Sequence, residues 1–420
     1  MRMTQFAQRF CKKTGILELM DDLGQAMAGS TEMRMLGGGN PAHIPEINQL
    51  WRARTQEILN NGQELEETLA NYDTPRGKES FLEAMAELLN QKFGWNLTGK
   101  NIAITNGSQT AFFLLLNLFS GHDTKGQLNR VMFPLCPEYI GYADQAVEEG
   151  ALATRPAKIN LTRPGFFKYG VDFDNLEISD DIGALCVSRP TNPTGNVLTD
   201  QEVHKLSALA ASKDIPFIID NAYGAPFPNI LFREATPFWD HHVILSMSLS
   251  KLGLPSVRTG ILVGSEEIID AVSACNAVLS LSNGSLGQTL VHPLVKNGDL
   301  LRISDEIIRP FYAERAKTAI ESMQDAFSTD IPYRLHECEG ALFLWLWLPE
   351  LPISSFELYQ RLKKRNVLVV SGHYFFYGLE EDWDHSKQCL RLSYAQDPQD
   401  FRDAAFIMAD EIRKIMDQNP

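Results

Sequence analysis

Short apolar runs alternate with helical patterns through the middle of the chain. The runs that predict strands are residues 102–105, 131–134, 152–155, 184–188, 217–220, 243–247 and 260–263. Apolar residues three or four positions apart predict helices over 109–118, 139–149, 200–212 and 266–279. Strand and helix in alternation predict an α/β fold whose sheet is mainly parallel. The runs AITN, ALCVS and FIID are apolar rather than alternating, which is typical of strands buried on both faces.

The pattern changes after residue 298. It predicts a long helix over 303–327 interrupted near Pro310, strands in 341–348, 367–370 and 390–394, and helices over 354–365 and 399–416. This mixture indicates a smaller α+β domain. We therefore expect an N-terminal segment, 1–45, that packs with the small domain. The large domain, with a seven-stranded sheet, is expected at 46–300 and the small domain at 301–420.

Composition and charge exclude several classes of protein. The 420 residues are 44% hydrophobic and 22% charged, as in globular proteins, and the net charge of −15 opposes binding to nucleic acid or to anionic membranes. The six cysteines lie at least 50 positions apart, so their spacing predicts no zinc site and no other metal site. We see no secretory signal and no apolar stretch long enough to span a bilayer, and we expect a reducing, cytoplasmic location.

The first candidate for chemistry is a lysine directly after a predicted strand. In the run S-M-S-L-S-K, Lys251 follows strand 243–247, and the ends of such strands are where α/β sheets bind ligands. Ser248 and Arg258, in S-V-R-T-G, offer a hydroxyl and a cation that suit a phosphate. A lone lysine is usually a solvated surface group, but this combination is far rarer.

Further polar residues follow other predicted strands. Asp220 is either a turn or helix-capping residue or a carboxylate that faces a cationic ring nitrogen, with Tyr223 near the same ring. Asn192, in R-P-T-N-P-T-G, is either a turn former or a ligand contact. Ser108 and Gln109 open a helix after a strand, which is a common cap and also a phosphate site.

Arg391 lies inside the apolar strand pattern C-L-R-L-S-Y. An unpaired buried charge is costly, so this arginine requires a partner. Either it meets an internal carboxylate, or it forms a bidentate clamp on the carboxylate of a substrate. The strand alone leaves both readings open.

Together these elements resemble the fold type I pyridoxal-phosphate-dependent aminotransferases, the aspartate aminotransferase group. They occur in that family's order: G-S-Q, P-x-Y, N-P-T-G, D-x-x-Y, S-x-S-K, R-x-G and R-L-S-Y, from about Leu36 to the C-terminus. The likeness is greatest to members that act on valine and pyruvate. It implies pyridoxal 5′-phosphate as cofactor and a ping-pong reaction. L-Valine or another small aliphatic amino acid gives its nitrogen, and pyruvate takes it to become L-alanine.

The resemblance also implies a role for each matching residue. Lys251 would bond covalently to the cofactor aldehyde and then move the proton at the substrate Cα. Asp220 would pair with the ring nitrogen, while Asn192 and Tyr223 donate to the ring oxygen. Tyr139, in P-E-Y, would stack on the ring. The residues implied to hold the phosphate are Ser108, Gln109, Ser248, Arg258 and, from a second subunit, Tyr72.

For the substrate, the resemblance implies that Arg391 binds the α-carboxylate, assisted by Asn192 and the Gly39 backbone. Tyr72, in N-Y-D-x-P-x-G, implies a homodimer with shared active sites. One departure concerns Arg258, whose interval from Lys251 is one residue shorter than in many members of the family. We expect the loop to absorb it.

Four alternatives remain open from the sequence: another reaction on the same cofactor, such as a C–S lyase or a decarboxylase, an aminotransferase with a different donor, a non-catalytic cofactor-binding regulator, and an inert scaffold with a degenerate site. The intact Lys251, Asp220 and Arg391 argue against the inert scaffold. Regulators of that kind carry a basic DNA-binding domain in front, whereas here the catalytic pattern begins by residue 36. No second basic residue for a dicarboxylic substrate is evident. The apolar run I-L-E-L-M at 16–20 predicts either a lid over the site or a helix packed on the small domain.

Overall fold

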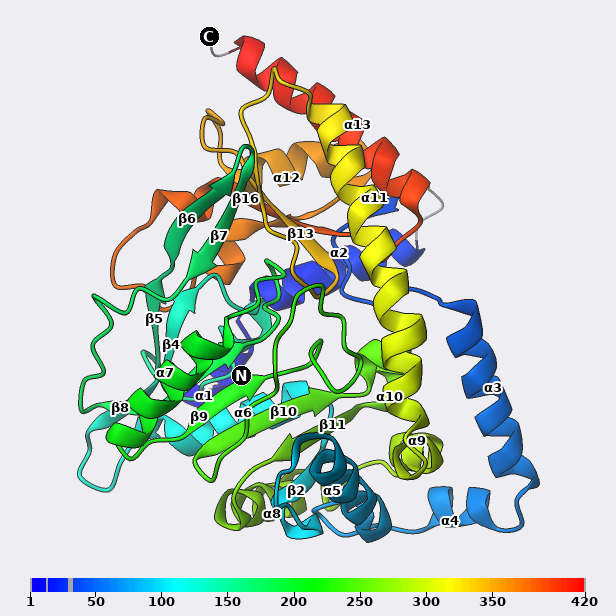
Figure 1. Ribbon diagram of the computed structural model, residues 1–420. Coiled ribbons are helices and arrows are strands. Elements are labelled where there is room, and N and C mark those ends of the chain that lie inside the picture. Colours follow the sequence, from blue (N-terminus) through cyan, green and yellow to red (C-terminus); the bar gives the residue numbers. More distant parts are fainter. Residues whose placement is uncertain (1, 13, 29–32, 419–420) are drawn as a thin grey trace.

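The computed structural model describes residues 2–12, 14–28 and 33–418, and its centre is an eight-stranded sheet (Figure 1). The strand order is β2 (Ile102–Asn106), β11 (Thr259–Val263), β10 (Val243–Ser248), β9 (Phe217–Asp220), β8 (Ile182–Ser188), β4 (Leu128–Cys136) and β3 (Gly121–His122), with β5 (Leu152–Pro156) also on β4. Strands β10, β9, β8, β4 and β5 pair in parallel, and β11 is antiparallel to both neighbours. The mainly parallel sheet and its seven strands are confirmed, and the two-residue β3 is added at one edge.

Helices cover both faces of this sheet. Successive residues of a strand point to opposite faces, so they pack into two separate hydrophobic clusters. On one face Ile218 and Ile244 pack with α6 (Ser108–Phe119) and α8 (Glu266–Ser280). On the other face Ile219 and Leu245 join the core that contains α5 (Glu79–Phe93), α7 (Asp200–Ser212) and α9 (Leu286–Lys296). Burial on both sides explains why these strands are apolar throughout.

The helix predicted over 139–149 is wrong. Only a 3₁₀ turn, Ile140–Tyr142, forms there, and the chain then runs irregularly to Gly150. Side chains of α6 take the place of helical partners: Asn117 Nδ2 donates to Gln145 O at 2.9 Å, and Val147 N donates to Asn117 Oδ1 at 2.7 Å. Long-range hydrogen bonds therefore override the local periodicity.

A second, six-stranded sheet lies above the first in Figure 1. Its order is β15 (Val370–Ser371), β16 (Cys389–Ser393), β13 (Phe343–Trp347), β12 (Arg334–His336), β7 (Phe166–Gly170) and β6 (Lys158–Arg163). Strands β6 and β7 were not predicted. They come from the middle of the chain, and β7 pairs in parallel with β12. Helices α12 (Ser355–Lys364) and α13 (Pro398–Gln418) accompany this sheet, close to the predicted ranges.

A long helical rod connects the two sheets. It consists of α10 (Asp299–Ile303), a π-helical turn (Ser304–Ile308) and α11 (Arg309–Phe327), which runs upward in yellow in Figure 1. The predicted interruption near Pro310 is this π turn, since proline at that position lacks the N–H of a regular helix. None of the helices described is long and apolar enough to cross a membrane.

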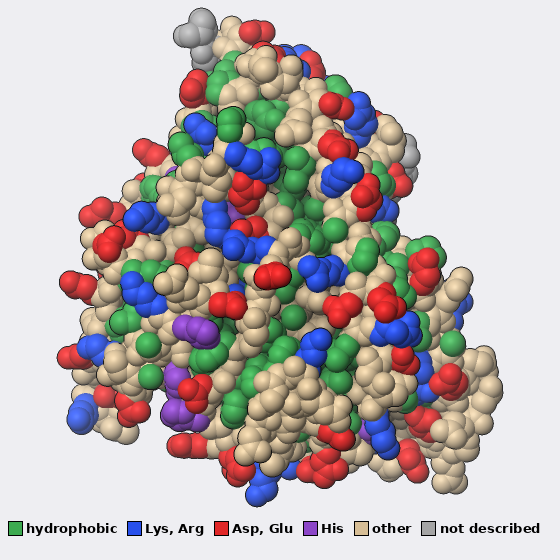
Figure 2. All heavy atoms as spheres, viewed as in Figure 1, with side chains coloured by type: hydrophobic (Ala, Val, Ile, Leu, Met, Phe, Trp, Pro, Cys, Tyr) green, Lys and Arg blue, Asp and Glu red, His purple; other side chains and the backbone are tan. Residues whose placement is uncertain are grey.

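The N-terminal part contributes one strand of a separate two-stranded sheet, with helices before and after that strand along the chain. The short strand β1 (Arg34–Met35) pairs with β14 (Val367–Leu368), and α2 (Gly15–Ala28) follows α1 (Gln5–Phe10) along the chain. Helices α3 (Pro45–Asn60) and α4 (Glu64–Ala70) lie at one side of the molecule in Figure 1. Acidic and basic side chains are interspersed over the face that Figure 2 shows.

Candidate active site

A cavity of about 310 Å³ lies where β8, β9 and β10 end. It is closed by the start of α6, by β16 and by α2. Carboxyl ends of parallel strands meet at one edge of a sheet, so residues far apart in sequence converge there. The predicted residues that line it are Gly39, Ser108, Gln109, Tyr139, Asn192, Asp220, Tyr223, Ser248, Lys251, Arg258 and Arg391.

Lys251 lies in a 3₁₀ turn directly after β10, with its amine inside the cavity. Nζ donates to Gly39 O at 2.6 Å and lies 5.2 Å from the centre of the Tyr223 ring. Burial and the positive charge of Arg391 lower the pKa of Lys251 to about 8, against the opposing effect of Asp220. A lysine with a depressed pKa offers a neutral, nucleophilic amine near neutral pH.

Asp220 ends β9 and has no basic partner among the ion pairs of the described residues. Its Oδ2 accepts a hydrogen bond from the hydroxyl of Tyr142, and its Oδ1 accepts one from Ala222 N at 3.0 Å. Burial raises the pKa of Asp220 to about 6, while these two donors and Lys251 favour the ionised form. Tyr142 was not singled out in the sequence, because its contact with Asp220 joins residues 78 positions apart.

The opposite end of the cavity is built to hold an anion. Gly107, whose φ is +78°, is the N-cap residue of the twelve-residue helix α6. Because glycine has no side chain, it forms no capping hydrogen bond with the first N–H groups of the helix. A Cβ at Gly107 would overlap the guanidinium of Arg258. Ser248 Oγ donates to Ser250 Oγ at 3.0 Å, and Ser250, which flanks Lys251 in the run S-M-S-L-S-K, also lines the cavity. A helix N-terminus, an arginine and hydroxyls in this arrangement have the chemistry that suits a phosphate.

Arg391 projects from β16 into the other side of the cavity. Its Nη1 donates to Asn192 Oδ1 at 2.9 Å and its Nη2 to Gly37 O at 2.7 Å, while Nε has no partner in the described part of the chain. The guanidinium carbon lies 4.3 Å from the centre of the Phe343 ring. No carboxylate of the described residues pairs with this buried arginine. The choice that the sequence left open therefore goes against an internal ion pair.

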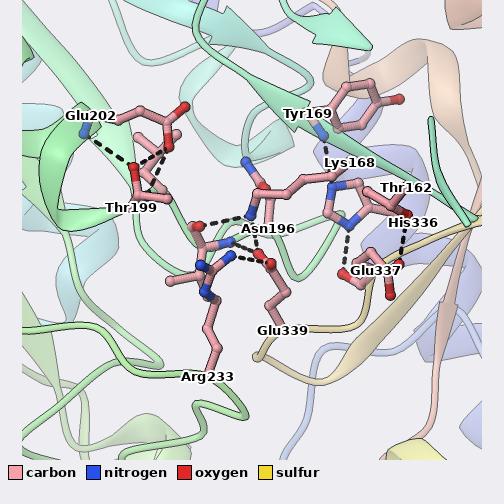
Figure 3. Close-up of polar contacts among 12 residues, drawn as sticks. Thr162, Lys168, Tyr169, Asn196, Thr199, Glu202, Arg233, His336, Glu337 and Glu339 are labelled. Carbon is pink, nitrogen blue, oxygen red and sulfur yellow. Dashed lines mark hydrogen bonds and ion pairs between the residues drawn. The ribbon is translucent and has the colours of Figure 1, made fainter. Parts of the chain in front are cut away.

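A partly buried ion cluster around Glu339 holds the segment that follows Asn192, and Figure 3 shows this cluster beside Asn196. Glu339 accepts hydrogen bonds from Lys168 and Arg233, and from Val197 N at 2.9 Å. Lys168 Nζ also donates to Val197 O at 2.9 Å. The segment after Asn192 is thus bonded through both its N–H and its C=O, which fixes the turn against the second sheet.

Helix α2 supplies an apolar wall. Ile16, Leu19 and Met20 line the cavity, and the helix is tied to the second sheet's side by Tyr374, whose hydroxyl donates to Glu18 Oε2 at 3.1 Å. The run that the sequence predicted as either a lid or a packed helix does both.

Two predictions concern residues outside the cavity. Tyr72 is 81% exposed and does not line the cavity of this subunit.

No metal was predicted from the cysteine spacing. Among the described residues, Asp240, His241 and His242 bring metal-ligating atoms within 4.8 Å of one another, but none of them lines the cavity.

Comparison with known proteins identifies the class. The family model described as aminotransferase class I and II matches residues 36–405, and the chain belongs to this family. The valine–pyruvate aminotransferase of Escherichia coli (strain K12) is 45% identical over 414 residues, which cover 99% of each chain.

Two solved structures are similar to the whole chain. A putative amino-acid aminotransferase from Psychrobacter arcticum 273-4 has 44% identity and a TM-score of 0.97, with 100% of both chains covered. The valine–pyruvate aminotransferase from Salmonella typhimurium LT2 has 44% identity and a TM-score of 0.89, with 96% of this chain and 100% of that chain covered. The fold type I architecture predicted from the sequence is therefore confirmed.

Family membership implies pyridoxal phosphate, and the residues present fit it. The free start of α6 and Arg258 suit the phosphate, and Asp220 suits a protonated ring nitrogen. Lys251 has the depressed pKa that an amine needs to attack an aldehyde. The partnerless Nε of Arg391 lies on the substrate side.

Proposed function

We propose that this chain transfers the amino group of L-valine, or of another small aliphatic amino acid, to pyruvate, with pyridoxal 5′-phosphate as cofactor. One observation supports it above the others: Arg391, a buried arginine without a carboxylate partner, shares a cavity with Lys251. Both substrates bring an α-carboxylate that such an arginine binds in a bidentate manner. The 45% identical relative bears the name of this reaction.

In this proposal each of four residues in the cavity has its own role in the reaction. Pyridoxal phosphate, when bound, supplies an aldehyde and an electron-withdrawing ring. Lys251 would hold the aldehyde covalently through its neutral amine and, once the amino substrate takes its place there, would move the proton at the substrate Cα. Asp220 holds a proton on the ring nitrogen. Arg391 and Asn192 fix the substrate carboxylate, so that the Cα–H bond faces Lys251.

Other residues orient the cofactor in this proposal. Tyr139 stacks on the ring, and Asn192 and Tyr223 donate to its oxygen. Ser108, Gln109, Ser248 and Arg258 hold the phosphate. Burial raises the pKa of both tyrosines, so they remain neutral donors at physiological pH.

The wall of the cavity favours a small aliphatic side chain. Ile16, Leu19 and Met20 face the substrate side and carry no charge. A dicarboxylic substrate would place its second carboxylate against this apolar wall without a cation, which is costly. The wall also excludes water while Lys251 moves the proton.

We further propose a cytoplasmic homodimer with shared active sites. An exposed apolar patch supports it, made of Leu69, Tyr72, Val278, Leu279, Leu281 and Leu286. Its two segments are joined by the hydrogen bond from Ser285 to Asp73. Patches of this kind mark protein interfaces, and Tyr72 would reach the cofactor phosphate of the second subunit from it.

The transfer of labelled nitrogen tests the reaction. Purified protein with the cofactor, ¹⁵N-valine and pyruvate should yield ¹⁵N-alanine and 2-oxoisovalerate in equal amounts, and no alanine without pyruvate. Aspartate in place of valine is the control for the side-chain argument and should react far more slowly. Loss of sulfide from cysteine without alanine formation would favour a C–S lyase instead.

A further inference from the structure

The acid that faces the cofactor ring is held by a tyrosine that the proposed reaction has not yet used. Tyr142 is 1% exposed, and its hydroxyl donates to Asp220 Oδ2. Its ring packs against Phe112 at 4.6 Å and Phe133 at 5.6 Å between centroids. Because aromatic rings on two sides fix this side chain, the position of its hydroxyl is fixed as well.

Asp220 depends on such a donor because its surroundings disfavour a negative charge. The carboxylate is buried, and none of the ion pairs of the described chain involves it. A second buried carboxyl, Glu138, lies close enough to interact with it, and accepts hydrogen bonds from Ser188 N at 2.9 Å and Ser188 Oγ at 2.6 Å. The titratable groups that interact with Asp220 are Glu138, Tyr139, Tyr142, Cys186, Tyr223 and Lys251.

Of these groups, only Lys251 brings a positive charge, and its ammonium must lose that charge with its proton before the amine can bond to the cofactor. The two remaining donors, Tyr142 and the backbone N–H of Ala222, then satisfy one oxygen each. They leave lone pairs on the carboxylate for the ring nitrogen. A hydrogen bond to an ionised carboxylate lowers its pKa and orients it.

We propose that Tyr142 is a positioning residue that keeps Asp220 ionised and aimed at the ring nitrogen of the cofactor. The inference rests on the proposed use of pyridoxal phosphate but not on the identity of the amino acid. Without the Tyr142 hydroxyl, the shared proton moves from the ring nitrogen toward Asp220. The ring then withdraws fewer electrons, and the cofactor binds less tightly.

The test compares two variants that each remove one buried hydroxyl. Tyr142→Phe removes the donor to Asp220 and keeps the packed ring. Tyr377→Phe is the matched control, because the Tyr377 hydroxyl is buried and has no hydrogen-bond partner among the described residues. Each is measured without substrate, by equilibrium dialysis against pyridoxal phosphate and by titration of the visible spectrum of the loaded protein with pH.

Tyr142→Phe should weaken cofactor binding about tenfold and move the spectral midpoint to higher pH, since one hydrogen bond to a charged group is lost. Tyr377→Phe should change neither quantity. In the Asp220→Asn background, Tyr142→Phe should have no further effect on either one. A merely structural role would lower the thermal midpoint and leave the spectral midpoint unchanged.

Unchanged affinity and midpoint in Tyr142→Phe, an equal shift in Tyr377→Phe, or an additive effect in the Asp220→Asn background would each overturn the inference. If Tyr142→Phe fails to fold, Tyr142→Met replaces it, because methionine also fills the space without a hydrogen-bond donor and should therefore weaken cofactor binding and raise the spectral midpoint in the same way; a native midpoint in that variant would overturn the inference. Failure of the valine reaction alone would leave these measurements unaffected, so the two proposals can fail separately.

Discussion

Replacement of Arg391 by methionine should impair the binding of substrate without lowering the stability of the fold. Arg391→Met keeps an unbranched side chain of similar length and removes the charge. The native guanidinium is 2% exposed, and it donates only to Asn192 Oδ1 and Gly37 O, with Nε left without a partner. A buried charge without a counter-ion costs several kcal/mol, and its two neutral partners offset only part of that cost.

The expected magnitudes follow from these contacts. A bidentate clamp on a substrate carboxylate provides two charge-assisted hydrogen bonds of about 1.5–3 kcal/mol each. Their loss lowers kcat/KM for valine and for pyruvate by about two to four orders of magnitude. The thermal midpoint of the cofactor-free protein should stay the same or rise, because the buried charge disappears with its bonds.

Steady-state kinetics and thermal unfolding at a single protein concentration measure both effects. Arg189→Met is the matched control, since Arg189 is also buried but pairs with Asp200 and donates to Leu198 O at 2.7 Å. That variant should lose stability. If Arg391→Met unfolds at a much lower temperature, or keeps more than a tenth of kcat/KM, then Arg391 is structural and the argument for the carboxylate site is refuted.

Three further predictions concern the cofactor. Lys251→Ala should abolish turnover and the visible band; retained transamination would show that another residue is the nucleophile. Because the pKa of Lys251 is lowered to about 8, the rate of cofactor loading should rise with pH and level off above that value; stopped-flow absorbance measures it, and a flat profile would contradict it. Arg258→Gln should weaken binding of pyridoxal phosphate by about ten- to a hundredfold, yet leave the binding of unphosphorylated pyridoxal unchanged in dialysis.

The sequence predicted those elements of the fold that are determined by their own residues. Strands such as β9 and β10 are apolar because both faces are buried, and that composition can be read directly. The residues at their ends, Asp220 and Lys251, then come together because parallel strands end at one edge.

The errors arose where distant residues decide the structure. Strand β7 pairs with β12, more than 160 positions away, and nothing local indicates that contact; β6 enters the sheet only through its pairing with β7. The helix expected over 139–149 is replaced by bonds to Asn117, which lies on another helix. Tyr142 was missed for the same reason: its role depends on Asp220, which is 78 positions further along.

The visible spectrum of the purified protein, recorded alone, after L-valine and then after pyruvate, tests the central claim most directly. We predict a band from the cofactor bound to Lys251 that bleaches when valine is added and returns when pyruvate is added. That cycle requires the cofactor, the lysine and both half-reactions. A band that valine leaves unchanged would contradict the proposed substrate. No band at all after addition of pyridoxal phosphate would contradict the assignment of Lys251 and the account that rests on it.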